Sequence, residues 1–137
     1  MVDRELLNER LKLLSEYLED LEELQKLTYE DFVQDKRTRR YVERTLHLAV
    51  ECCLDISSHI IADLKLREPG SYADMFTVLA ENSIIPHADL PDLQKMAQFR
   101  NVIVYHYARI DPEIVFRVLK RNLGIIRGFG EHMNALL

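Results

Sequence analysis

Leucines recur at alternating intervals of four and three residues near the start of the chain, at Leu7, Leu11, Leu14, Leu18 and Leu21. An α-helix turns once every ~3.6 residues, so this spacing places the five side chains on one stripe. It predicts an amphipathic helix over about residues 3–26. Because a helix with an apolar stripe is stable only when the stripe is buried, the chain must fold into an arrangement of packed helices.

A longer stripe with the same spacing occupies the middle of the chain, at Val42, Leu46, Ala49, Cys53, Ile56 and Ile60. It predicts a helix over about residues 36–66, which the Pro69-Gly70 pair ends. Shorter patterns predict helices over about residues 72–82 and from about residue 90 into the motif described below. A last helix is expected to begin at Asp111-Pro112-Glu113, and Thr28 to cap a short helical turn over residues 29–34.

No alternating strand pattern persists anywhere in the sequence. The expected fold is therefore all-α, an up-and-down bundle of about five helices. With 137 residues the chain is long enough for one hydrophobic core and too short for two ordinary ones, so residues 1–137 are expected to form a single domain. The net charge of −5 gives no global reason to expect nucleic-acid binding, which would need a local basic patch.

The two cysteines, Cys52 and Cys53, are adjacent. They offer neither a disulfide framework nor a zinc-site spacing, and small core residues are the favoured interpretation. The N-terminus carries no apolar signal segment, and no run is judged long and apolar enough to cross a bilayer. The sequence predicts a cytoplasmic protein that does not insert into a membrane.

The densest polar chemistry lies in the segment Arg100-Asn101-Val102-Ile103-Val104-Tyr105-His106-Tyr107. If this segment is helical, Arg100 and Tyr107 are two turns apart on nearly the same face. An arginine grips two phosphate oxygens and a histidine moves a proton near neutral pH, which together suffice for metal-free RNA cleavage by the substrate's own 2′-hydroxyl. The alternative is a polar helix end with a solvated arginine and surface tyrosines.

An Arg-Asn pair, an aliphatic run and then His-x-Tyr resemble the signature of the HepT-like toxins, small helical-bundle ribonucleases of the HEPN superfamily. Three further segments resemble that family's helices: residues 51–60, residues 71–82 and residues 110–115. The resemblance therefore covers nearly the whole chain.

The resemblance implies a homodimer in which the two motifs meet in a cleft between the subunits. It implies an RNA-cleaving toxin that works without a cofactor beside a small nucleotidyltransferase antitoxin of the MntA type. In the family, that antitoxin transfers AMP from ATP to the tyrosine of His-x-Tyr and silences the nuclease. Aligned on Arg100, this tyrosine is Tyr107. Arg100 is expected to bind the scissile phosphate, and Asn101 to donate to it or to brace the dimer cleft.

The chain departs from the family signature at one position. The family's histidine comes five residues after the arginine, where this chain has Tyr105, and His106 follows one residue later. Either His106 replaces the displaced base, or Tyr105 marks a weakened or inactive form. Reduced activity is favoured, because a phenol ordinarily ionises near pH ~10 and is a poor base at neutral pH.

A polar stripe accompanies the apolar one on the long central helix, with His47, Glu51, Asp55 and His59 at four-residue intervals. Residues of these types at this spacing can ligate a metal, although the family resemblance needs none. The favoured interpretations are that Glu51 or Asp55 orients Arg100, or that the stripe is a solvated surface with charge pairs.

The main basic cluster of the sequence comprises Lys36, Arg37, Arg39, Arg40 and Arg44. Arg37, Arg39 and Arg40 are candidates for steering RNA towards the cleft. They can equally be the solvated start of a helix or bind the acidic face of a partner. An RNA-cleaving toxin is the leading hypothesis. The alternatives are a non-catalytic module that docks a nucleotidyltransferase and a nucleotide-binding helical adaptor.

Overall fold

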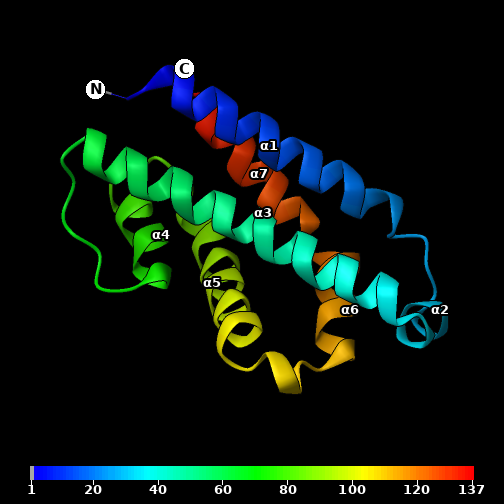
Figure 1. The fold of residues 1–137 in the computed structure, drawn as a ribbon. Coiled ribbons are helices and arrows are strands. Elements are labelled where there is room, and N and C mark those ends of the chain that lie inside the picture. Colours follow the sequence, from blue (N-terminus) through cyan, green and yellow to red (C-terminus); the bar gives the residue numbers. More distant parts are fainter. Residues whose placement is uncertain (1) are drawn as a thin grey trace.

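The computed structural model describes residues 2–137, and these residues form an all-helical fold in which no β-strand occurs (Figure 1). The predicted fold class is confirmed. The α-helices are α1 (Arg4–Glu23), α2 (Tyr29–Gln34), α3 (Lys36–Asp63), α4 (Tyr72–Glu81), α5 (Leu90–Tyr105), α6 (Pro112–Arg121) and α7 (Leu123–Asn134). Two short 3-10 turns, His87–Asp89 and Tyr107–Arg109, precede and follow α5.

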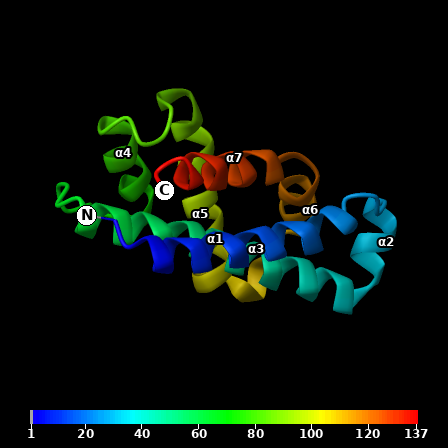
Figure 2. The same ribbon diagram turned by 90° about the horizontal axis from the view of Figure 1, so that it is seen from above.

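The long helix α3 is the centre of the molecule and contacts each of the other six α-helices. Figure 1 shows α1 lying along α3, and Figure 2 shows α7 beside α1 when the molecule is seen from above. The apolar stripe of α3 is buried throughout, as are Cys52 and Cys53. Burial raises the pKa of the Cys52 thiol to about 11, which is consistent with its role as a small core residue.

Short polar side chains begin five of the helices by accepting hydrogen bonds from backbone N–H groups in the first turn. These capping residues are Asp3, Thr28, Asp35, Ser71 and Asp111. Asp35 explains how α3 tolerates basic residues at its positive end. Its carboxylate accepts from two backbone N–H groups and the Thr38 hydroxyl, which lowers its pKa, and its charge offsets the cations.

The expected number of about five helices is wrong for the described residues, because seven α-helices are present. The predicted last helix is divided at Asn122, which ends α6 and precedes α7. Asparagine and the nearby Gly124 both have low helix propensity, so the chain can change direction here at little cost. The short helical segment predicted over residues 29–34 with Thr28 as its cap is confirmed as α2.

The sequence-based judgement that no segment is apolar and long enough to cross a bilayer is also wrong. By length and composition α3 passes that test, and it is the one helix among residues 2–137 that does. In the fold, 61% of its most apolar window is buried against the other helices. Its apolar character is accounted for by a central position, since a helix surrounded by others needs apolar side chains on most of its surface.

Candidate functional site

The polar motif lies where α5 ends. The helix stops at Tyr105, and His106 leaves the helical conformation with φ −124° and ψ 34°. Its backbone N–H still donates to the carbonyl of Val102 at 2.8 Å, and Tyr107 begins the following 3-10 turn. The expectation that Arg100 and Tyr107 share one helix face is therefore wrong. Three consecutive β-branched residues, 102–104, weaken the last turn, because such side chains lose rotamer freedom in a helix.

Arg100 is held by contacts from three helices. Its Nε donates to Oε1 of Glu51 on α3, and its Nη1 donates to Oδ1 of Asn101 at 3.1 Å. Its guanidinium carbon lies 4.5 Å from the centre of the Tyr72 ring on α4, a cation–π contact. Burial lowers the pKa of Arg100, but the hydrogen bond that it donates to Glu51, the charge of Glu51 and the Tyr105 hydroxyl as a further acceptor raise it above its ordinary value. The side chain is 11% exposed and remains a cation.

A line of polar contacts extends behind Glu51 along α3. Nη1 of Arg44 lies 3.2 Å from Nδ1 of His47, and Nε2 of His47 lies 3.2 Å from Oε1 of Glu51. Because the guanidinium of Arg44 can only donate, Nδ1 is the accepting nitrogen and Nε2 carries the proton given to Glu51. The Glu51 oxygen that holds Arg100 is therefore itself held by a histidine.

Asp55, the second acid expected to orient Arg100, pairs elsewhere. Its Oδ2 accepts from Nε of Arg10 on α1 at 2.5 Å, and its Oδ1 lies 3.4 Å from Nε2 of His59. The carboxylate therefore joins α3 to α1. The polar stripe on α3 is thus divided into separate pairs, and no group of three or more possible metal ligands is found among residues 2–137.

The three residues after Val104 are open to solvent. Tyr105 is 68% exposed and Tyr107 is 76% exposed, and His106 is also exposed. Tyr105 is the one of the three whose side chain interacts with Arg100. The side chains of His106 and Tyr107 make no hydrogen bond within the described chain, so each is free to meet a substrate or a partner.

Of the basic residues at the start of α3, Arg44 contributes to this arrangement through His47, whereas Arg37, Arg39 and Arg40 do not. Arg37 and Arg40 are exposed, and Arg39 is partly buried with a buried Nε that has no hydrogen-bond partner. Arg40 precedes Glu51 by 11 residues, which is roughly 16 Å along the helix. Any contact of this cluster with RNA would therefore be made away from the motif.

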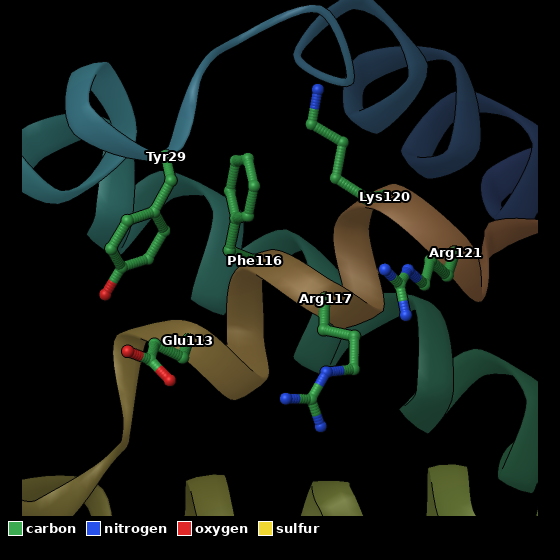
Figure 3. Close-up of a pocket in the computed structure, with 6 residues that line it drawn as sticks. All are labelled: Tyr29, Glu113, Phe116, Arg117, Lys120 and Arg121. Carbon is green, nitrogen blue, oxygen red and sulfur yellow. The ribbon is translucent and has the colours of Figure 1, made fainter.

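Two cavities of the described chain differ in their position relative to the motif. One of about 350 Å³ adjoins the motif and is lined by Pro69, Gly70, Ser71, Tyr72, Met75, Asn101 and Tyr105. Another, of about 500 Å³, lies between α2 and α6 and contains none of the motif residues (Figure 3). In it, Phe116 packs against Tyr29 with ring centres 5.3 Å apart, while Arg117 and Arg121 project from the neighbouring side of α6.

Sequence reasoning missed Tyr72 and the roles of Arg44 and His47. Tyr72 is 28 positions before Arg100, and no local pattern distinguishes it from any other aromatic residue at a helix start. His47 was noted as a potential metal ligand, and the four-residue interval to Glu51 was the signal that it would contact that carboxylate instead.

Comparison with known proteins identifies the family. Residues 14–133 match the family described as HepT-like ribonucleases. The mRNA nuclease HepT of Shewanella oneidensis is 35% identical over 92 residues, which cover 67% of this chain and 69% of that protein. The tRNA nuclease HepT of Aphanizomenon flos-aquae is 26% identical over 110 residues, which cover 80% of this chain and 75% of that protein.

Solved structures agree with this assignment. The tri-AMPylated HEPN toxin of Shewanella oneidensis in complex with its MNT antitoxin has a TM-score of 0.87 at 26% identity, covering 97% of this chain and 99% of that one. YutE of Bacillus subtilis, described as a cytosolic protein, has a TM-score of 0.85 at 23% identity, covering 99% of this chain and 91% of that one. At this identity the likeness supports the fold alone. The chain therefore belongs to the HepT-like ribonuclease family.

Proposed function

We propose that this protein is the RNA-cleaving toxin of a toxin–antitoxin pair and that Tyr105 lowers its activity. The observation that carries the proposal is the fixed Arg100 guanidinium, held by Glu51, Asn101 and Tyr72 at the end of α5. The exposed His106 and Tyr107 follow it directly in the chain. Relatives named as mRNA and tRNA nucleases support the reaction class.

In the proposed reaction, Arg100 binds the scissile phosphate and stabilises the charge that develops on its oxygens. The 2′-hydroxyl of the preceding nucleotide loses its proton and attacks the phosphorus, and the bond to the 5′-oxygen of the next nucleotide breaks. The products are a 2′,3′-cyclic phosphate and a 5′-hydroxyl. His106 moves the proton, but it lies one residue beyond the family's histidine position, and Tyr105 at that position is a weak base.

The proposal includes a homodimer whose two motifs face each other. Val102 and Ile114 are apolar, exposed and close in sequence to the motif. A second copy of the chain would remove these side chains from water, which favours association. The arrangement would also supply a second Arg100 and His106 to one RNA strand.

The proposal also includes regulation at Tyr107 by a nucleotidyltransferase antitoxin. The Tyr107 oxygen attacks the α-phosphorus of ATP, loses its proton and releases diphosphate, which leaves AMP on the phenol. With 76% of its surface exposed, Tyr107 is accessible to such a partner. The AMPylated Shewanella oneidensis toxin in complex with its antitoxin supports this step.

The test is cleavage of end-labelled RNA by the purified chain and by Arg100→Ala. We expect the chain to yield products with cyclic phosphate ends, and Arg100→Ala to yield about a hundredfold less. Arg127→Ala is the matched control, because Arg127 pairs with Glu22 on α1 and lies outside the motif. Equal cleavage by Arg100→Ala and by the unaltered chain would contradict the proposal. If neither cleaves RNA, while Tyr107 still accepts AMP, the chain is a docking module instead.

A further inference from the structure

The cavity beside the motif is lined by neighbours of Arg100, although Arg100 itself is not among the lining residues. Three of the seven residues that line it contact the Arg100 side chain. Tyr72 lies under the guanidinium at 4.5 Å, Asn101 accepts from Nη1 at 3.1 Å, and the Tyr105 hydroxyl is placed to accept from it. A group that occupies this cavity therefore lies directly next to whatever Arg100 binds.

The chemistry of the walls favours a flat, uncharged ligand. None of the seven lining residues carries a charged side chain, so the cavity is not itself a phosphate site. Tyr72 and Tyr105 each present an exposed aromatic ring, and aromatic rings are the surfaces on which proteins stack nucleobases. Asn101 adds an amide that can donate and accept, which suits the polar edge of a base.

The loop side of the cavity is held in place before any ligand binds. Arg67 donates to both carboxylate oxygens of Asp74 at 2.9 Å, and its Nε donates to Glu81 at 2.7 Å. Asp74 in turn accepts from the backbone N–H of Gly70 at 2.8 Å and donates its own N–H to Ser71 Oγ at 3.1 Å. These bonds tie the loop to α4, so little conformational entropy is lost when a ligand enters.

We propose that this cavity binds one nucleobase of the RNA, that of the nucleotide adjoining the phosphate on Arg100. The inference rests on the proposed RNA cleavage and deepens it by assigning a base-binding subsite to Tyr72, Tyr105 and Asn101. Its volume of about 350 Å³ is at the lower end for ligand pockets, which suits a single base. The subsite gives the nuclease a means to select where a strand is cut.

Gly70 allows the cavity to be filled without disturbing Arg100. A Cβ at Gly70 would meet only Asp74 Oδ2, at 3.8 Å, and Gly70 does not have the left-handed backbone conformation that requires glycine. Gly70→Leu is therefore compatible with the fold and adds bulk to the cavity. Ala62→Leu is the matched control, since Ala62 is exposed and lines only the neighbouring cavity on α3.

The experiment uses RNA made uncleavable by a 2′-O-methyl group at the scissile nucleotide, with 2-aminopurine placed on either side of the phosphate. Stacking on tyrosine quenches this fluorescent base. We expect one of the two placements to be quenched severalfold by the unaltered chain and by Ala62→Leu. Gly70→Leu should lose the quenching and bind about tenfold more weakly by anisotropy, as expected for one lost base stack. Tyr72→Leu should lose the quenching too, whereas Tyr72→Phe should keep the RNA affinity, because its ring can still stack on the base.

The inference is overturned if Gly70→Leu quenches as well as the unaltered chain. It is also overturned if the unaltered chain binds the RNA but quenches neither placement, the result expected when a second copy fills the cavity. Failure of the proposed function gives a different result, because Arg100→Ala would then bind the RNA as tightly as the unaltered chain.

Discussion

Replacement of Glu51 by glutamine separates the charge of this side chain from its shape. Glutamine keeps an oxygen that can accept from Nε of Arg100, but it removes the negative charge that neutralises the guanidinium. Arg100 then becomes a less firmly held and more strongly cationic group. The weaker positioning of Arg100 should slow RNA cleavage, whereas its added positive charge should tighten RNA binding.

The size of the effect follows from the exposure of the pair. Breaking a fully buried ion pair costs about 3–5 kcal/mol, whereas an exposed pair contributes about 0–1 kcal/mol. The Arg100 side chain is 11% exposed and that of Glu51 is 38% exposed, so the pair lies between these limits. We expect Glu51→Gln to lower the free energy of unfolding by about 1–2 kcal/mol in urea titrations.

RNA binding and cleavage should change in opposite directions. The unneutralised guanidinium should tighten RNA binding and steepen its dependence on salt by about one phosphate contact. The rate of single-turnover cleavage should fall about tenfold, because the guanidinium is no longer fixed over the phosphorus. Asp55→Asn is the matched control. Asp55 is one turn further along α3, carries the same charge and pairs with Arg10, so its replacement should leave the cleavage rate unchanged. Equal rates for Glu51→Gln and the unaltered chain, or an equal loss in Asp55→Asn, would refute this reasoning.

Three further predictions concern the dimer, the loop beside the cavity and the regulatory tyrosine. Val102→Asp should convert a dimer into monomers in analytical ultracentrifugation. Leu64→Asp, at an equally exposed apolar site away from the motif, should remain a dimer. Dimers in both variants would contradict the proposed interface. Hydrogen bonding to Arg67 lowers the pKa of Asp74 to about 2 from its ordinary 3.8. The stabilisation of the fold by the ionised Asp74 carboxylate is therefore complete above about pH 4 and is lost as pH falls towards 2. The difference in urea midpoint between Asp74→Asn and the unaltered chain should therefore shrink over that range, and a difference independent of pH would contradict the assignment. Tyr107→Phe should keep its cleavage activity but gain no AMP-sized mass after incubation with the nucleotidyltransferase and ATP; a mass gain equal to that of the unaltered chain would exclude Tyr107 as the acceptor.

Much of the fold was predictable because its determinants are local. The four-and-three spacing on α1 and α3 requires only the period of a helix, and caps such as Thr28 and Asp111 act within their own first turn. The exception was the break at Asn122. Its side chain makes no capping hydrogen bond, and the apolar positions on either side continue in helical register, so the direction change depends on packing rather than on a local signal.

The candidate site was predictable only where residues are neighbours in sequence. The motif itself and the possibility that an acid of the central helix holds Arg100 came from spacing and from family resemblance. The choice of Glu51 over Asp55 did not, because both acids lie on one face of α3 and only the placement of α5 distinguishes them. The contact of Tyr72 with Arg100 likewise depends on how α4 packs beside α5.

The most direct test of the account is the rate of RNA cleavage by Tyr105→His, compared with that of the unaltered chain. Both proteins are then measured again with Arg100→Ala added. A histidine at position 105 restores a base that ionises near neutral pH, and we expect cleavage to rise by about a hundredfold, the lower range for general acid–base catalysis. Arg100→Ala should abolish this gain. An unchanged rate in Tyr105→His, or a gain that survives Arg100→Ala, would contradict the claim that Arg100 anchors the reaction and that Tyr105 limits it.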